Sequence, residues 1–169
     1  AIIMSNFFNN GQRMPNIFER ARAYDNWNEG NFQLQEDGYE ETYKTLSNDE
    51  KSFVYRHPIL AYKFNNNANK AKSAVEHFPD KEDGYGDAVR HCYWCALNQV
   101  SAGYKSPIAK EFGYAHENIP NNEAKTMDLH NNSVGYHLGN LAIINGWSEE
   151  EFLNQVINAA NNGKLQIGL

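Results

Sequence analysis

The chain is poor in several features that identify a functional class directly. Only two cysteines occur among its 169 residues, too few for a disulfide framework. No apolar run approaches the roughly 20 residues of a membrane span. Lys and Arg number 15 against 21 Asp and Glu, so the net charge of −6 argues against a basic nucleic-acid footprint and a polybasic membrane patch. We therefore expect neither a nucleic-acid partner nor a transmembrane segment.

Sheet signals are scarce as well, whereas helix signals recur along the chain. Apolar residues rarely alternate with period two, and only residues 165–169 resemble a strand. Hydrophobic residues make up 41% of the chain and aromatic residues 13%, which is enough for a core. The helix signals are capping boxes at Ser47 and Ser148, a cap at Asn122, helix-starting prolines, and helix-ending glycines at 103, 146 and 163. They predict helices over residues 16–27, 48–56, 59–78 (with the asparagine run at 65–67 as a candidate break), 87–102, 107–117, 122–144 and 149–162.

These elements predict a single all-α domain over residues 1–169, a bundle of six or seven helices. We expect residues 84–145 to form the core that carries the motifs and residues 1–45 to form a peripheral docking segment. The chain begins with Ala1 rather than Met, so it is expected to be a processed product or a fragment. Its 24 asparagines are typical of secreted bacterial proteins.

The densest polar and aromatic segment spans residues 84–95 and carries Asp87 and His91. Side chains four residues apart on a helix share one face. The carboxylate can therefore orient the imidazole for acid–base catalysis, or both groups can bind a metal ion. A simpler interpretation is that Asp87 caps the helix N-terminus and that His91 is a buried histidine with satisfied hydrogen bonds.

Two later helices bring further polar candidates. His116 and Glu117 are adjacent, so they point about 100° apart and do not face one point without help. A histidine at a helix C-terminus is also favoured by the helix dipole. Asp128 and Asn132 share a helical face, and burying them without partners would cost roughly 1–3 kcal/mol each. Gly135 is expected on another face, where it allows a neighbouring helix to approach closely.

Together the three segments predict one shared polar site, because a bundle core places helix-borne acids, amides and histidines side by side. Its metal ligands would be Asp87, His91 and Asp128. His130 and His137 lie seven residues apart and are expected to be surface histidines. The alternative is that the same polar residues form a structural network in a non-enzymatic helical interaction module.

The pair Cys92 and Cys95 needs a separate interpretation. A C-x-x-C pair occurs in redox motifs and in halves of zinc sites. A redox pair usually follows a strand, and a zinc site needs a second pair of ligands at similar spacing; the sequence predicts neither. We therefore expect two buried, dispensable helix thiols, with a redox protein as the alternative.

Three stretches of the motif-bearing region form a recognisable pattern: Gly86-Asp87-Ala88 with Arg90-His91, Ala115-His116-Glu117, and Met127-Asp128 with Asn131-Asn132 and Val134-Gly135. With them, residues 84–139 and, loosely, 162–165 resemble an uncharacterised family of secreted or surface-exposed bacterial domains, often found at the C-terminal tips of polymorphic toxins. This sequence departs from the family's pattern at Cys95, Tyr136 and His137, which are not counted as motif positions. The resemblance implies that the motif positions are Asp87, Arg90, His91, His116, Glu117, Asp128 and Asn132.

The function expected from these residues is that of a small secreted hydrolase, a phosphoesterase or a lipase-like enzyme. Arg90 and Asn132 would bind substrate, with Arg90 holding a phosphate or oxyanion. No G-x-S-x-G nucleophile motif is present, so water would attack, activated by histidine or by a divalent ion (calcium, magnesium or zinc). Such a toxin would act at the cell envelope of a target bacterium and would have a cognate immunity protein. The candidate catalytic residues are Asp87, His91, His116 and Glu117.

Overall fold

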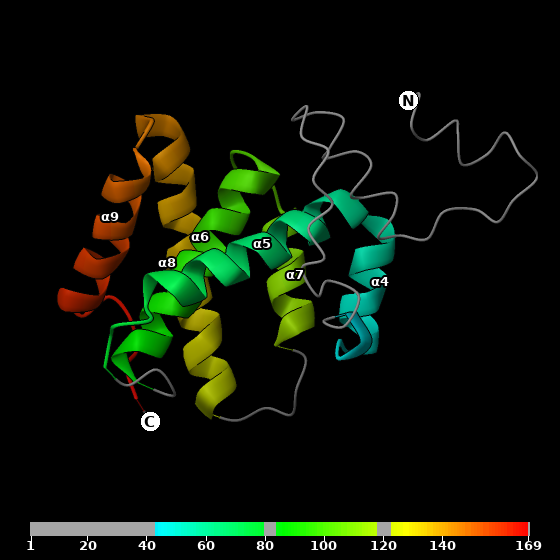
Figure 1. Cartoon of the computed structure of the whole chain (residues 1–169), viewed down its shortest axis with the longest axis horizontal. Coiled ribbons are helices and arrows are strands. Elements are labelled where there is room, and N and C mark those ends of the chain that lie inside the picture. Colours follow the sequence, from blue (N-terminus) through cyan, green and yellow to red (C-terminus); the bar gives the residue numbers. More distant parts are fainter. Residues whose placement is uncertain (1–42, 80–83, 118–122, 169) are drawn as a thin grey trace, which may run out of the picture. The chain divides into compact units, whose positions relative to one another are not determined.

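The computed structural model describes residues 43–79, 84–117 and 123–168. These residues form six α-helices and no strand, so the all-α prediction is confirmed (Figure 1). Residues 165–168 are irregular, which removes the strand suggested by their sequence. The helix expected over 16–27, and nearly all of the expected docking segment 1–45, lie outside the described residues.

Backbone contacts divide the chain into two compact units, residues 1–65 and 66–169. In the first unit, α4 (Asn48–Arg56) begins at the predicted capping box. The Ser47 hydroxyl accepts a hydrogen bond from the Glu50 N–H at 3.1 Å, and the Glu50 carboxylate accepts one from the Ser47 N–H at 3.0 Å. Phe53 of α4 stacks on Phe64, with ring centroids 5.8 Å apart. Apolar stacking therefore holds α4 against the first half of α5 (Pro58–Ala74).

The unit boundary falls inside α5, which runs without interruption through its asparagines. The candidate break at 65–67 was therefore wrong, and the helix ends four residues before Phe78. The Asn67 amide donates to Asn98 and Ser101 of α6, at 3.0 Å in both cases. Because this amide bonds to another helix, it does not compete for the backbone of its own.

In the second unit, α6 (Tyr85–Ala102) is the central helix. It ends at Gly103, whose φ of 108° suits glycine. Its N-cap is Gly84, without a side-chain hydrogen bond, so Asp87 is not the cap but a residue of the first turn. The carboxylate therefore does not cap the helix. It faces the interior, and Asp87 is 6% exposed.

Three further helices complete this unit: α7 (Ile108–His116), α8 (Glu123–Asn145) and α9 (Glu149–Asn161). The Ser148 hydroxyl accepts from the Glu151 N–H at 3.2 Å, as the sequence predicts for the start of α9. Gly146 and Gly163 follow α8 and α9 with positive φ, which ends each helix. Asn122, the expected cap of α8, lies outside the described residues.

The most extensive helix pair is α6 with α8, and two glycines of α8 allow their close approach. A Cβ at Gly135 would overlap the carbonyl oxygen of Cys92, and one at Gly139 would lie 2.6 Å from the carbonyl oxygen of Ala96. Gly135 therefore faces α6, on the same stripe as Asp128 and not on another face as expected. Close packing of these two backbones brings the polar residues of both helices together.

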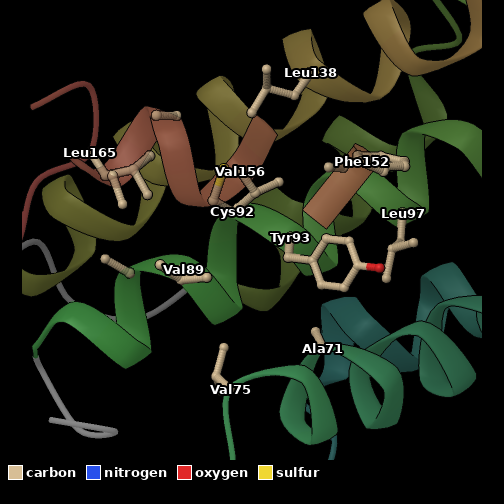
Figure 2. Packing of buried hydrophobic residues seen from close by; sticks show 14 of the residues in the cluster. Ala71, Val75, Val89, Cys92, Tyr93, Leu97, Leu138, Phe152, Val156 and Leu165 are labelled. Carbon is tan, nitrogen blue, oxygen red and sulfur yellow. The ribbon is translucent and has the colours of Figure 1, made fainter. Parts of the chain in front are cut away.

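The hydrophobic core of this unit joins α6 to α5, α8 and α9. Tyr93 meets Phe152 of α9 edge to face, with centroids 5.7 Å apart, and Cys92 points toward Val156 (Figure 2). Ala71 of α5 and Val75, which directly follows α5, join the same cluster. Among the described helices, none is both long enough and apolar enough to cross a membrane.

Candidate functional site

The first two turns of α6 and of α8 bring three predicted ligands together. His91 Nε2 lies 3.7 Å from Asp87 Oδ1 and 3.8 Å from Asp128 Oδ1. One ligand atom from each residue lies within 4.8 Å of the other two. We call Asp87, His91 and Asp128 the triad. The predicted sharing of a face by Asp87 and His91, and the predicted convergence of Asp128 with them, agree with these distances.

The His91 imidazole is neutral near pH 7. Its side chain is 10% exposed, and burial, followed by the positive charge of Arg90, lowers the pKa of His91 from 6.5 to about 4. The Asp87 carboxylate raises this pKa but does not reverse the shift. A neutral imidazole has a free lone pair on one nitrogen, which is the form that binds a metal or accepts a proton.

The triad has the dimensions of a metal-binding site. Atoms that bind one metal ion lie at most about 5 Å apart, and one ligand atom of each triad residue lies within 4.8 Å of the others. Metal–oxygen and metal–nitrogen bonds in proteins measure roughly 2.0–2.6 Å. Three protein ligands leave coordination positions for water and substrate, as catalytic metal sites do.

Arg90 lies at the edge of the triad and is the nearest positive charge. Its guanidinium donates to Asp87 Oδ1, and its Nη2 lies 3.3 Å from His91 Nε2. The Arg90 side chain is 37% exposed, whereas that of Asp87 is 9% exposed. The guanidinium of Arg90 thus neutralises a buried carboxylate, while part of the same side chain is exposed to solvent.

His116 and Glu117 separate at the end of α7, as adjacent residues on a helix should. His116 is exposed and its ring meets Trp94 edge to face, with centroids 5.0 Å apart. A positive charge on His116 contributes to the lowered pKa of His91, after burial and Arg90. Glu117 is 4% exposed, and its charge acts on Cys95 and Tyr136 instead. His116 is therefore accessible to a substrate and Glu117 is interior.

Asn132 is placed on the α6-facing stripe of α8, one turn beyond Asp128, but it is 2% exposed. Its Oδ1 has no hydrogen-bond partner among the described residues. It lines a cavity of about 30 Å³ between α7 and α8, together with Lys110 and Tyr136. The burial of Asn132 favours a role in positioning neighbouring groups. Its predicted contact with substrate stays a prediction.

The other histidines of this region are exposed and lie outside the triad, as expected. His130 bonds the backbone carbonyl of Lys164 at 2.9 Å, and His137 lines a separate pocket. Cys92 and Cys95 are both buried and free, which agrees with their interpretation as helix thiols.

Two structural features of the site region were missed by sequence reasoning. Asn131 is fully buried and exchanges two hydrogen bonds with the backbone of Gln166, at 2.8 and 3.0 Å, so it anchors the segment after α9. Trp94 packs against His116 and Phe112 and thereby orients the end of α7. The adjacent pair Asn131-Asn132 could have indicated the anchoring role of Asn131. Two adjacent helix residues point in different directions, so only one of them can face α6 and the other needs a different partner.

Comparison with known proteins gives one match. No curated protein and no solved structure matches the chain. A family model, described as a domain of unknown function (DUF6973), matches residues 51–164, about two-thirds of the chain and all seven motif positions. The expected resemblance to an uncharacterised family is confirmed at that level. The chain therefore belongs to the DUF6973 family.

Proposed function

We propose that this domain is a hydrolase that uses a divalent metal ion bound by Asp87, His91 and Asp128 to activate water against a phosphoester or ester. The observation that carries the proposal is the convergence of two carboxylates and one neutral imidazole from α6 and α8. An imidazole in the ligand set favours zinc or manganese over calcium, which prefers oxygen ligands alone. A divalent ion at such a site lowers the pKa of a bound water and so supplies the nucleophile.

Arg90 and His116 are the protein groups placed to act on substrate. A cation in the triad competes with Arg90 for Asp87, and the arginine is exposed enough to turn toward a substrate anion instead. His116 is exposed beside His91, which suits a general acid that protonates the leaving group. Glu117 is interior, so it would act indirectly, by positioning neighbouring groups of α7 and α8.

We further propose that the domain is a secreted bacterial effector or toxin, delivered to the envelope of a target cell and neutralised by an immunity protein. The support is the resemblance of its motif region to domains at the tips of polymorphic toxins. The hydrolase proposal does not depend on this assignment.

A structural polar network is the second candidate, and two observations favour it. The Arg90–Asp87 ion pair already supplies a cation to the cluster. His91 Nδ1 is buried without a hydrogen-bond partner among the described residues, whereas a metal-bound histidine usually donates from its second nitrogen. In that case the triad would hold α6 against α8 and no metal would bind.

Metal titration separates these two candidates. Isothermal titration with Zn²⁺, Mn²⁺, Mg²⁺ and Ca²⁺ should show one stoichiometric ion in the wild-type protein. His91→Ala and Asp128→Asn should each weaken binding at least tenfold, because each removes one of three ligands. His77→Ala, which removes an exposed histidine outside the triad, should leave the affinity unchanged. A wild-type protein that binds none of the four ions would refute the metal site.

Activity provides the second test. The wild-type protein should hydrolyse bis(p-nitrophenyl) phosphate or a p-nitrophenyl ester, and chelation should abolish this. His91→Ala should remove activity while the melting temperature changes by only a few degrees, and Asp87→Asn should weaken the activity. Growth inhibition on export to the periplasm should follow the same order. An unfolded His91→Ala protein, or a folded and fully active one, would favour the structural network.

A further inference from the structure

A second polar feature lies apart from the triad, where the loop after α6 meets the start of α7 and one face of α8. It is a pocket of about 400 Å³, within the size range of small-molecule sites. Its lining includes the side chains of Lys105, Lys110, Ser133, His137 and Asn140. It shares no residue with the triad, so its chemistry is independent of the metal site.

The pocket is positively charged in an acidic protein. Lys105 and Lys110 both line it, and none of the described residues lining it is Asp or Glu. Neither ammonium has an ion-pair partner within the described part of the chain, and Lys105 lies only over the Tyr104 ring, 5.2 Å from its centroid. Two uncompensated lysines in a chain with net charge −6 create a local potential that attracts anions.

The first turn of α7 adds to this potential. Ser106 and Pro107 line the pocket, and Pro107, the N-cap of the nine-residue helix, makes no side-chain hydrogen bond to it. The Ser106 hydroxyl accepts from the Ile108 N–H at 3.3 Å, which leaves the next N–H groups of the turn without a side-chain acceptor. Unpaired N–H groups and the positive end of the helix dipole favour a bound anion.

The loop that presents Lys105 is held in place by two side-chain amides, those of Asn140 and Gln99. Asn140 Oδ1 accepts from the Lys105 N–H at 2.8 Å, where Lys105 adopts a φ of 58° that is unfavourable for a residue other than glycine. Gln99, which is 2% exposed, donates to the carbonyls of Gly103 and Ser106 at 2.8 and 3.1 Å. Unfavourable backbone fixed by surrounding hydrogen bonds is typical of functional sites, since it orders the site before a ligand arrives.

We propose that this pocket binds the phosphate group of a small molecule. Two ammonium groups and a helix N-terminus that Ser106 caps only at Ile108 together match a dianionic, multi-oxygen group better than a monoanionic carboxylate. Ser133, His137 and Asn140 line the remainder of the pocket with polar groups that can complete the hydrogen bonding. The phosphate group is the shared chemistry of free phosphate and of a phosphorylated metabolite.

Direct binding measurements test the proposal on the metal-free chain. Inorganic phosphate, glycerol 3-phosphate and acetate are titrated into chelator-treated protein by calorimetry. Phosphate should bind saturably, and acetate should not. Tighter binding of glycerol 3-phosphate than of phosphate would identify an organic phosphate as the ligand, and equal binding would identify the phosphate group alone. Either result supports the pocket. Equal binding of acetate, or no saturation by phosphate below about 10 mM, would overturn it.

Matched variants locate the site. Lys105→Ala with Lys110→Ala should weaken phosphate binding at least tenfold, whereas Lys72→Ala, which removes an exposed lysine of α5, should change it less than twofold. Ser133→Leu keeps both charges but fills the pocket, and it should also prevent binding. His91→Ala should leave phosphate binding intact, which separates this pocket from the triad. Unchanged binding in the double lysine variant and in Ser133→Leu would refute the proposal.

Discussion

Cys92 and Cys95 lie three residues apart on one helix but have different surroundings. Cys92 is fully buried in the apolar core beside Val156 (Figure 2). Cys95 is 3% exposed and hydrogen-bonds Tyr136. Burial, helped by the neighbouring Cys95, raises the pKa of Cys92, and burial also raises the pKa of Cys95 to about 12. Thiolates are the reactive form, so both thiols are inert at neutral pH and the redox alternative loses its chemical basis.

This burial predicts how stability changes at alkaline pH. The pKa of Cys95 is raised from 9.0 to about 12, so above pH 9 the unfolded chain loses a proton that the folded protein keeps. The stabilisation linked to this thiol is therefore complete below pH 9 and is lost as the pH rises toward 12. The difference in unfolding free energy between wild type and Cys95→Ala, measured in urea, should fall by about 1–2 kcal/mol between pH 8 and pH 10.5.

Alkylation provides the control for that measurement. Neither thiol should react with iodoacetamide in the folded protein at pH 8, and both should react in urea. A difference in free energy that does not change with pH, or rapid alkylation of the folded protein, would show that the thiols are more accessible than their burial indicates.

Residue spacing predicted the pairing of Asp87 with His91 but not the rest of the site. Asp87 and His91 stand four apart on a helix, and that spacing alone puts their side chains on one face. The approach of Asp128 followed only from the expectation that bundle helices pack together. The Arg90–Asp87 pair was not predictable, because a long side chain has several partners within reach and the tertiary fold selects one.

At the scale of elements, local capping chemistry predicted most helix ends. Ser47, Ser148, Gly103 and Gly163 lie where the sequence placed them, because each satisfies backbone groups of its own helix or supplies a positive φ. The candidate break in α5 failed for the opposite reason. Low helix propensity at its asparagines is outweighed by hydrogen bonds from Asn67 to another helix, which no local pattern encodes.

The close contact of α6 with α8 predicts a strong effect of adding one methyl group. Gly135→Ala should gain about 1 kcal/mol of helix propensity, yet its Cβ would overlap the Cys92 carbonyl oxygen, which belongs to a rigid backbone. We expect a net loss of about 2 kcal/mol or more in the free energy of unfolding, measured in urea. The triad spans the same interface, so metal affinity should fall as well.

An exposed position of α8 serves as the control for this substitution. Ser133→Ala also introduces an alanine into α8, but on a face that meets solvent. It should change the unfolding free energy by less than about 0.5 kcal/mol. If Gly135→Ala were as stable as wild type, α6 and α8 would not be as close as the glycines indicate.

At the scale of the whole molecule, the second unit contains everything that the proposed functions need. The hydrophobic cluster is drawn from residues 71–165, the triad from 87–128 and the phosphate pocket from 99–140. The family model begins earlier, at residue 51 inside α4. Folding and metal binding are thus expected to depend on residues after the middle of α5.

A fragment of residues 58–169, which keeps α5 whole, should therefore fold by itself. Its core retains every member of the hydrophobic cluster, so it should give a helical circular dichroism spectrum and a cooperative thermal transition. It should bind the triad's metal ion within about threefold of the affinity of the full chain, because all three ligands and both of their helices are present. Val156→Asp in the same fragment buries an unpaired charge at a position that is fully buried, and it should abolish the transition. A fragment that melts without cooperativity, while the full chain melts sharply, would show that residues before α5 are part of the folding unit.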